Sequence, residues 1–451
     1  MVKHSTYDVI IAGAGLAGLS LAAALRPSGL RVCLLDSSPL AGAGGTGGAE
    51  SSDTAPSNAA SSNAGGWDTR IYALAPSSVR FLEALGAWEG VDSRRVTSVE
   101  MMEVAGDDLR ASPLQFSAFD TGTQQLACIL ESRELTRGLL AALAPTPQDD
   151  GGADRAASSE APDDASGQPW LRRLSGVSLT SIERSARGCR VELASQGETA
   201  DGQALPAAGA TLSLETTLLV GADGARSPTR LLAGLRARHT SYELTAVVAN
   251  FSVELAHAGM AFQWFRDGAV LAWLPLGGRC ISMVWSLPAA RAEALLAAPE
   301  AALAAQVAAA GEYRLGEMRL MGMPGAYPLN RIRVDDLAAD RVALIGDAAH
   351  TIHPLAGQGI NLGFRDARDL AGLIGAAAKA RSGTDCGAPA LLRRYRQMRA
   401  EDILSLDLLT HGLQRLFAAP DPLSRALRNS GLNLLEHLPM VKGVLARRAL
   451  A

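Results

Sequence analysis

The N-terminal βαβ pattern constrains the fold of this chain more than any other feature. An apolar run at residues 7–12 is typical of a buried parallel strand, and the apolar run at residues 30–36 is typical of a second one. Between them, Gly13, Gly15 and Gly18 open an apolar helix. A GxGxxG sequence that follows a strand and begins a helix predicts a dinucleotide-binding α/β unit.

The three glycines and one acid have separate roles in such a unit. The first glycine permits the tight turn, the second lets the backbone approach the pyrophosphate, and the third lets the helix pack on the strand. Asp36 ends the second strand, about twenty positions on, where a carboxylate can accept hydrogen bonds from ribose hydroxyls. No second GxGxxG follows a strand in this sequence, so we expect one dinucleotide to be bound by a fold of its own.

A second glycine-rich segment lies late in the chain. The apolar run at residues 341–345 breaks at Gly346-Asp347, and a helix-compatible pattern resumes at Gly357. The free backbone N–H groups and positive dipole of such a helix start suit an anionic or electron-rich ligand. His350 and His353 lie between the strand and the helix; each is either a general base or a structural hydrogen-bonding residue. Neither has partners at metal-ligand spacing, so no metal site is expected.

Two regions in the middle of the chain carry further predictions. Residues 217–224 read as a strand that delivers Asp223 to a glycine, and Ser227-Pro228 has the pattern of a helix cap and first turn. Residues 244–287 hold four β-like apolar runs separated by glycines, which predicts a separate antiparallel sheet. Its three tryptophans either wall an apolar pocket or belong to the core; they are Trp264, Trp273 and Trp285.

Composition excludes several classes of protein. A net charge of −4 and a pI near 6.0 give no basic footprint for nucleic acid. The five cysteines are far apart and form no CxxC pair, so neither zinc binding nor a disulfide framework is indicated. No signal peptide or uninterrupted apolar span is evident, and we expect a cytoplasmic protein.

Three motifs in this order resemble those of the class A FAD-dependent aromatic monooxygenases: the N-terminal glycine fingerprint, the Gly-Ala-Asp-Gly-Ala-Arg-Ser block, and the Gly-Asp-Ala-Ala-His block. Within that class the chain looks most like the ubiquinone-biosynthesis branch, the 2-polyprenylphenol hydroxylases. Four segments carry this narrower resemblance: residues 68–74, 130–135, 353–363 and 438–450.

The resemblance implies which residues contact FAD. The fingerprint glycines match the pyrophosphate site, and Asp36 the adenosine ribose site, where the family more often has glutamate. Two arginines match flavin-domain contacts, the mid-chain block serves both FAD and the reductant, and the late segment packs beside the ribityl chain and the isoalloxazine ring. The residues beyond the fingerprint are Arg70, Arg133, Asp223, Gly224, Arg226, Gly346, Asp347, Pro354, Gly357, Gln358, Gly359 and Asn361.

The resemblance also implies a fold and its division into domains. The expected fold is α/β, with a Rossmann-like FAD-binding domain, an inserted antiparallel-sheet substrate domain and a helical C-terminal region. Residues 37–66 and 145–168 have the composition of flexible insertions. The expected ranges are 1–98, 120–237 and 322–387 for the FAD-binding domain, 99–119 and 238–321 for the substrate domain, and 388–451 for the C-terminal region.

The implied reaction begins with hydride transfer from transiently bound NADH or NADPH to tightly bound FAD. Reaction with O₂ then gives a C4a-hydroperoxide, which hydroxylates the ring of a polyprenylated phenol in ubiquinone biosynthesis. Hydroxylation of a small soluble aromatic compound is one alternative, and a flavoprotein without oxygenase activity is another. A pocket with an arginine for a carboxylate would favour the small aromatic acid.

The basic, leucine-containing region from residue 391 onward has three readings. It is an amphipathic helical cover, a site of peripheral contact with the inner membrane, or a contact for other quinone-biosynthesis proteins.

Overall fold

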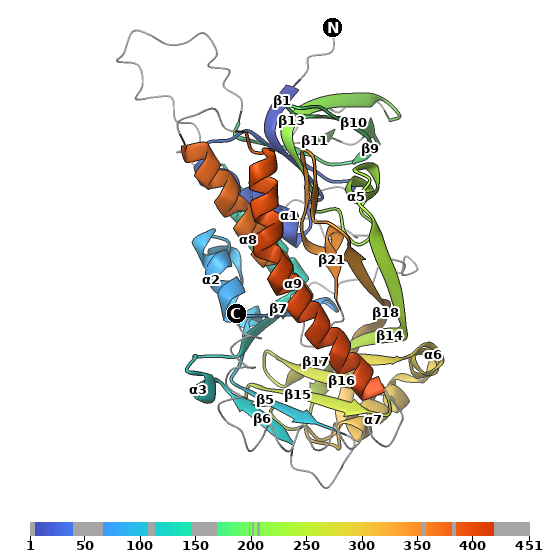
Figure 1. The fold of residues 1–451 in the computed structure, drawn as a ribbon. Helices are drawn as coiled ribbons and strands as arrows, with labels where there is room; N and C mark the ends of the chain where they lie inside the picture. The colour runs from blue at the N-terminus through green and yellow to red at the C-terminus, as the bar shows by residue number, and fades with distance from the viewer. Residues whose placement is uncertain are drawn as a thin grey trace.

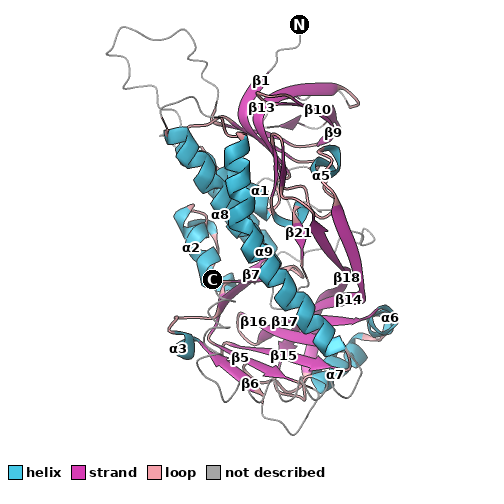
Figure 2. Ribbon diagram, viewed as in Figure 1, coloured by secondary structure: helices cyan, strands magenta, loops and turns pink. Residues whose placement is uncertain are grey.

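Two large sheets and two long helices, α8 and α9, form most of the protein in the computed structural model (Figure 1). The helices lie together along one side of the first sheet, and the second sheet lies at the other end of the molecule (Figure 2). The structure describes residues 5–38, 66–106, 113–145, 169–197, 199–200, 203–204, 208–352, 358–380 and 385–418.

The first sheet has the parallel centre that the N-terminal pattern predicts. β1 pairs in parallel with β2 and with β13, and β13 pairs in parallel with β20, so segments far apart in sequence lie side by side. The predicted strand–helix–strand unit is therefore confirmed. The strands of this sheet are β1 (Ser5–Ala12), β2 (Val32–Leu35), β8 (Leu171–Leu174), β9 (Val177–Arg184), β10 (Cys189–Ser195), β13 (Thr211–Gly221), β19 (Ala338–Ala339) and β20 (Val342–Leu344).

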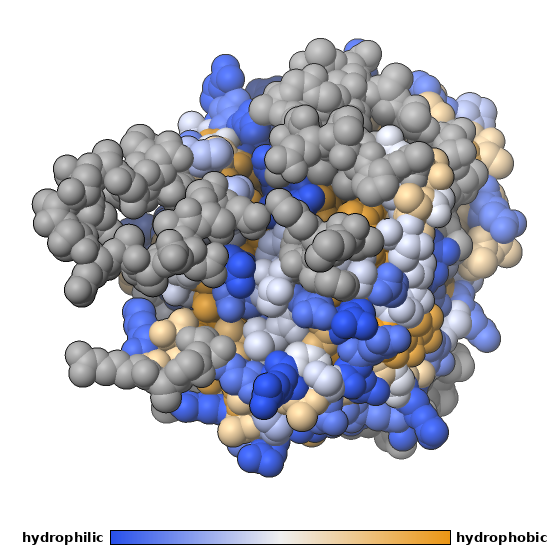
Figure 3. Space-filling model, turned by 90° about the horizontal axis from the view of Figure 1, so that it is seen from above, coloured by the Kyte–Doolittle hydropathy of each residue, from blue (hydrophilic) through white to orange (hydrophobic). Residues whose placement is uncertain are grey.

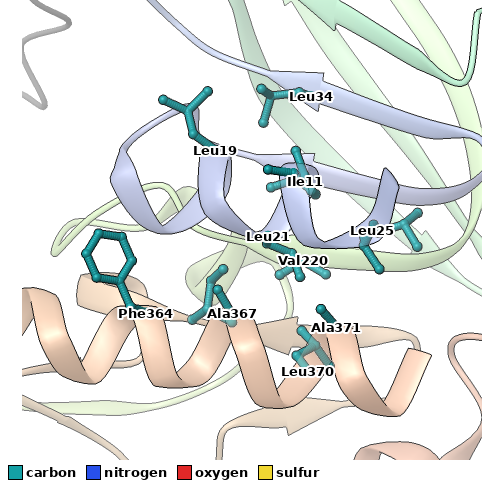
Figure 4. Packing of buried hydrophobic residues seen from close by; sticks show 14 of the residues in the cluster. Ile11, Leu19, Leu21, Leu25, Leu34, Val220, Phe364, Ala367, Leu370 and Ala371 are labelled. Carbon is teal, nitrogen blue, oxygen red and sulfur yellow. The ribbon is translucent and has the colours of Figure 1, made fainter. Parts of the chain in front are cut away.

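Helix α1 packs closely on α8 across small side chains. Leu21 of α1 lies against Ala367 and Leu370 of α8 in the buried cluster (Figure 4). A Cβ placed on Gly363 would lie 3.4 Å from the Cα of Gly346, so the turn before α8 also packs tightly. The helices are α1 (Leu16–Leu25), α2 (Pro76–Ala84), α3 (Ala118–Thr121), α4 (Ser132–Ala142), α5 (Pro228–Leu232), α6 (Ala289–Ala297), α7 (Glu300–Ala310), α8 (Gln358–Lys379) and α9 (Pro389–Ala418).

The second sheet is the predicted antiparallel one, extended at both edges. Its strand order is β21-β18-β14-β17-β16-β15-β5-β6. Two of its strands, β14 and β18, are 17 residues long and extend from this sheet back towards the first one (Figure 1). One face is covered by α6 and α7. Its strands are β5 (Met101–Ala105), β6 (Leu114–Ser117), β14 (Ala237–Val253), β15 (Met260–Arg266), β16 (Ala269–Leu276), β17 (Cys280–Pro288), β18 (Met318–Val334) and β21 (His350–Thr351).

The three tryptophans lie in the core beneath α6 and α7. Trp264 and Trp273 pack edge to face with ring centroids 4.6 Å apart, and both belong to one buried cluster with Trp285 and residues of α6 and α7. Of the two alternatives left open by the sequence, the structure therefore selects the core.

A short sheet, β3 (Ile71–Leu74), β7 (Ala127–Glu131) and β4 (Thr97–Val99), lies between the two large ones. β4 and β5 flank Glu100 but belong to different sheets, so residues 96–104 do not form a single strand. The pair β11 (Thr199–Ala200) and β12 (Gln203–Ala204) and four short 3-10 turns complete the described elements: η1 (Arg26–Ser28), η2 (Trp88–Gly90), η3 (Ser93–Arg95) and η4 (Gly346–Ala348).

Several predictions stay untested by this fold. The predicted domain boundaries remain predictions, and β18 runs through the one at residues 321–322. Most of the two predicted insertions, and residues 419–451, lie outside the described residues. In the described part of the chain, no helix is long and apolar enough to cross a membrane. Seen from above, hydrophobic residues form separated patches among hydrophilic ones (Figure 3).

We predict that Phe364→Ala destabilises the fold strongly. Phe364 is 1% exposed and packs in the α1–α8 cluster, so its removal leaves a cavity; the free energy of unfolding should fall by about 3–5 kcal/mol. Phe119→Ala is the matched control, because Phe119 is 90% exposed and its loss should change stability by no more than about 0.5 kcal/mol. Urea denaturation of both variants measures the difference, and equal losses would contradict this packing.

Candidate active site

The fingerprint glycines divide into two that the fold requires and one that it does not. Gly13 has φ +108°, and a Cβ there would lie 2.3 Å from the carbonyl oxygen of Ala222. A Cβ on Gly18 would lie 1.9 Å from the carbonyl oxygen of Gly13. In contrast, a Cβ on Gly15 would meet nothing within 4 Å. Gly15 is the N-cap of α1 and has no side-chain cap, so the open space beside it suits a phosphate at a helix start.

Asp36 lies beside this turn. Its Oδ2 accepts from the backbone N–H of Ala14 at 2.7 Å, and its Oδ1 accepts from the N–H of Ser38 at 2.8 Å. A carboxylate has about four lone-pair sites, so these two bonds orient Asp36 while leaving capacity for ribose hydroxyls.

Asp223 shapes a loop. Its carboxylate accepts from the hydroxyl of Ser227 and, through Oδ2, from the N–H of Thr229 at 2.8 Å, at the start of α5. The predicted cap is confirmed, because Ser227 accepts from the N–H of Arg230 and Pro228 occupies the first turn. Asp223 is therefore turned towards α5, which the sequence did not indicate.

The loop that Asp223 shapes presents two other predicted residues. Gly224 has φ +80° and open space where a Cβ would lie, which leaves room for a ligand beside the backbone. Arg226 is exposed on the same loop.

The turn at residues 346–350 is held from several sides. The Gly346 N–H donates to Oδ2 of Asp366 at 2.9 Å, and Arg230 donates to the carbonyl oxygen of Ala348 at 2.8 Å. Asp347 is exposed between buried Gly346 and Ala348. The fold thus fixes the backbone of this turn and directs the Asp347 carboxylate outward.

Arg70 and Asp347 share an electrostatic environment with Tyr72. Burial raises the pKa of the Tyr72 phenol; Arg70 lowers this pKa, and Asp347 raises it. The structure therefore brings Asp347, late in the chain, within electrostatic range of Tyr72 on β3, as Arg70 just before β3 also is.

Asn361 joins α8 to β3 and α2. Its Oδ1 accepts from the N–H of Ala75 at 2.8 Å and from the hydroxyl of Ser78 at 2.7 Å, and its Nδ2 donates to the carbonyl oxygen of Ala73 at 2.9 Å. The side chain thus fixes the start of α8. Gly359, in the same first turn, has open space where a Cβ would lie, and Gln358 is buried there.

His350 belongs to a buried network. Its Nε2 lies 2.6 Å from Oδ2 of Asp366, whose Oδ1 accepts from Nε of Arg399 at 2.8 Å. Burial alone would raise the pKa of Asp366, but His350, Arg399 and the Gly346 N–H outweigh it and lower this pKa. This geometry favours the structural alternative for His350. His353, Pro354 and Gly357 lie outside the described residues, so their roles stay predictions.

Arg133 lies in a cluster that sequence reasoning missed. It pairs with buried Glu131 at 2.8 Å, and Glu131 also accepts from Nε of Arg95 at 2.6 Å. Arg95 stacks on Trp67, 3.9 Å from the ring centroid. The only signal in the sequence was the segment Leu130-Glu-Ser-Arg, from which we predicted Arg133 as a site residue but not Glu131, the acid that pairs with it.

The segment at residues 66–70 links the short sheet to the second large sheet. Nδ2 of Asn250, on β14, donates to the carbonyl oxygen of Asp68 at 2.9 Å. A Cβ on Gly277 would lie 3.2 Å from the ring of Trp67. The segment that leads into the short sheet and the strands of the second large sheet therefore meet through direct contacts.

The sheet face that looks towards this junction carries no charged side chain on residues 246–252 of β14 or on β15–β17. Successive residues of a strand point to opposite faces, and the buried cluster under α6 and α7 takes one set. The other face includes Ala261, Leu274 and Leu276, which pack towards β3 and β7. We call this set the junction face: Ala246, Val248, Asn250, Ser252, Ala261, Gln263, Phe265, Val270, Ala272, Leu274, Leu276, Cys280, Ser282, Val284 and Ser286.

These features fit FAD together with an uncharged second ligand. Gly15, Gly224 and Gly359 leave open space at backbone positions where a dinucleotide would approach. Ala272, Leu274 and Val284 are half-buried near the middle of the junction face. They form an apolar wall opposite the FAD-binding side.

Comparison with known proteins agrees with this geometry. A family model described as "FAD binding domain" matches residues 171–403, and a second model with the same description matches residues 8–78. An uncharacterized Synechocystis protein is 29% identical over 446 residues, covering 99% of this chain and 93% of its own length.

Two relatives with functional names match almost the whole chain. A Rhodospirillum rubrum protein named ubiquinone hydroxylase UbiL is 30% identical over 449 residues, covering 98% of this chain and 89% of its own length. The Escherichia coli 3-demethoxyubiquinol 3-hydroxylase is 29% identical over 453 residues, covering 100% and 98%. Among solved structures, Pseudomonas aeruginosa PqsL, described as a probable FAD-dependent monooxygenase, is 22% identical with a TM-score of 0.66, covering 95% of this chain and 99% of its own.

We predict that Gly15→Ala weakens FAD binding while leaving the fold intact. A methyl group at Gly15 occupies open space and its φ of −69° suits alanine, so apo-protein stability should change by less than about 1 kcal/mol. FAD affinity should fall about tenfold or more, as measured by fluorescence titration. Gly18→Ala is the contrasting variant and should instead destabilise the fold, because of the clash with Gly13. Unchanged FAD affinity in Gly15→Ala would contradict this assignment.

We predict that Asp366→Asn lowers the free energy of unfolding by about 3–5 kcal/mol at pH 7, because it leaves Arg399 without its buried carboxylate. The folded-state pKa of Asp366 lies below its ordinary 3.8, so its contribution is full above that value and is lost as the pH falls further. The difference in free energy of unfolding between wild type and variant, measured by urea denaturation, should therefore be smaller at about pH 3 than at pH 7. Asp120 is exposed, so Asp120→Asn is the control and should leave the free energy of unfolding unchanged. If the loss of stability in Asp366→Asn did not depend on pH, the ion-pair account would be contradicted.

Proposed function

Because the chain belongs to the family of FAD-dependent monooxygenases, we propose that it hydroxylates the ring of an uncharged, polyprenylated phenol in ubiquinone biosynthesis, with NADH or NADPH as reductant. The two relatives with functional names support this choice, since one is named a ubiquinone hydroxylase and the other a 3-demethoxyubiquinol 3-hydroxylase. The ring position and the preferred reductant are not part of the proposal.

The uncharged junction face is the observation that carries the proposal. A substrate carboxylate that leaves water needs a cation or several hydrogen-bond donors. The junction face of β14–β17 offers no arginine, lysine or histidine, and its centre is formed by Ala272, Leu274 and Val284. Such a surface matches a neutral phenol with an apolar chain better than a small aromatic acid.

The chain's own residues are assigned to binding and positioning. When bound, FAD would supply the chemistry that no side chain can supply, namely hydride acceptance and the activation of O₂. The first turn of α1 and Gly15 bind the pyrophosphate, and Asp36 binds the ribose. Asp347 holds the middle of the cofactor, beside Arg70.

The start of α8 has an electrostatic role. The positive end of its dipole, at Gln358 and Gly359, stabilises negative charge on the reduced ring system. The apolar junction face excludes water from the opposite side, so that the oxygen is delivered to the phenol ring.

His350 is proposed as a positioning residue, because its Nε2 is committed to Asp366 at 2.6 Å. His353 keeps the role of candidate general base, and Pro354 and Gly357 that of neighbours of the flavin ring. Arg133, Asp223, Gly224 and Arg226 remain proposed contacts around the cofactor, with Asp223 acting through the shape of its loop. Peripheral contact with the inner membrane and association with other quinone-biosynthesis proteins also remain proposals.

We predict that substrate charge decides activity. With purified holoenzyme and NAD(P)H, a short-chain prenylated phenol should stimulate flavin reduction and yield a hydroxylated ring. The same phenol with a carboxylate in place of the prenyl group should bind at least about tenfold more weakly, because the junction face offers it no cation. Asp347→Ala serves as the cofactor control and should lose FAD.

Two outcomes would overturn the proposed function. A preference for the carboxylate would favour a small aromatic acid as substrate. Flavin reduction by NAD(P)H with no hydroxylated product from any phenol would favour a flavoprotein without oxygenase activity.

A further inference from the structure

Gln263 is a buried amide on the junction face. It lies on β15, with Ala272 of β16 as its neighbour on one side and Val104 of β5 on the other. Its side chain belongs to a residue that is only 6% exposed. Gln263 makes no side-chain hydrogen bond to any part of the chain that the structure describes.

The surroundings of Gln263 are apolar, but they do not fully enclose its carboxamide. Phe265 and Val104 flank it on the same face and belong to an apolar cluster with Val270. A carboxamide can donate two hydrogen bonds and accept two. Neither polar atom of Gln263 is among the fully buried side-chain atoms that lack a partner in the described residues, so the carboxamide reaches accessible space at the junction face, where a ligand could bond to it.

The other amide of the junction face is committed through its nitrogen, whereas its Oδ1 is buried without a partner in the described residues. Asn250 donates from Nδ2 to the carbonyl oxygens of Asp68, at 2.9 Å, and Trp67, at 3.4 Å. It therefore joins the sheet to the segment at residues 66–70. Gln263 is thus the amide of this face that has no structural role in the described chain.

The register places Gln263 beside the half-buried apolar wall. Ala272 lies directly opposite Gln263, and Val284 lies opposite Ala272 on the next strand. Neighbouring strands are about 4.8 Å apart. A ring lying over Ala272 would therefore contact Val284 on one side and come within reach of the Gln263 carboxamide on the other.

We propose that Gln263 is a specificity-determining residue that hydrogen-bonds an uncharged oxygen substituent on the substrate ring. This inference rests on the proposed function, since it requires a neutral phenol at the junction face. A carboxamide offers both a donor and an acceptor without a charge, which matches a hydroxyl, methoxy or carbonyl group. The prenyl chain has no polar atom and gains nothing from this residue.

The test compares two ligands and two proteins. The ligands are 2-prenylphenol and 6-methoxy-2-prenylphenol, which differ only in one oxygen substituent. Their dissociation constants are measured with the FAD-loaded protein from the change in flavin absorbance, without NAD(P)H. Wild type should bind the methoxy compound about tenfold more tightly, and Gln263→Met should reduce this preference to about twofold or less.

Stability provides a readout that separates this role from a structural one. Because the Gln263 side chain has no hydrogen-bond partner among the described residues, Gln263→Met should keep FAD affinity and should hold the Tm. Gln115→Met is the matched control on the same sheet; Gln115 is exposed, and its replacement should leave the ligand preference unchanged. Gln263→Leu provides the same comparison if the methionine variant is poorly expressed.

The outcomes distinguish this inference from the function on which it rests. If wild type hydroxylates the phenols but binds both equally, or if Gln263→Met keeps the preference, the role of Gln263 is overturned and the function stands. A clear fall in Tm for both Gln263 variants would also overturn it, by showing a structural role. If wild type binds neither phenol, the function and the role of Gln263 fall together.

Discussion

The buried carboxylate of Asp366 is the interaction on which the arrangement of the site depends. This carboxylate accepts hydrogen bonds from the Gly346 N–H and from Arg399, and it pairs with Nε2 of His350. A single acid thus joins the turn before α8, the short strand β21 and α9. Three charged or polar groups could not remain buried there without one another, because each would lose its hydration. Their pairing fixes the backbone of residues 346–350 and leaves Asp347 exposed, where its charge acts on the Tyr72 phenol. The hydrogen bonds that fix this turn therefore lie inside the protein, on residues other than Asp347.

The rest of the site follows from the meeting of two sheets with different chemistry. The first sheet supplies backbone N–H groups, glycines and carboxylates, which suit the phosphates and hydroxyls of a dinucleotide. The second sheet presents an uncharged face, with its three tryptophans turned to the opposite side under α6 and α7. Contacts at Trp67 and Asn250 set how these two surfaces approach each other. Under the proposed function, a charged cofactor and a neutral substrate would lie against different walls.

Local signals were readable from the sequence, whereas side-chain directions were not. The glycine fingerprint, the Ser227-Pro228 helix start and the antiparallel character of residues 244–287 depend on short-range conformational preferences, and the structure confirms them. The division of residues 96–104 between two sheets depends on partners that are distant in sequence, and so does the commitment of Asn361 to α2 and β3. The roles of Glu131 and Asp366 could not be predicted from the sequence. A buried acid can be recognised only when the positions of the arginines that pair with it are known. The alternation along β14–β17 predicted two faces but could not show which one α6 and α7 would cover. The roles of individual residues towards FAD and substrate stay predictions.

Isotope labelling tests the central claim most directly, since the claim is that this chain directs one atom of O₂ into the ring of a neutral phenol. The holoenzyme is supplied with NAD(P)H, a prenylated phenol and ¹⁸O₂, and the product is examined by mass spectrometry. The account predicts one ¹⁸O atom on the aromatic ring and none when the label is supplied as H₂¹⁸O instead. A ring that gains no label from ¹⁸O₂, with the reducing equivalents recovered as hydrogen peroxide, would contradict it.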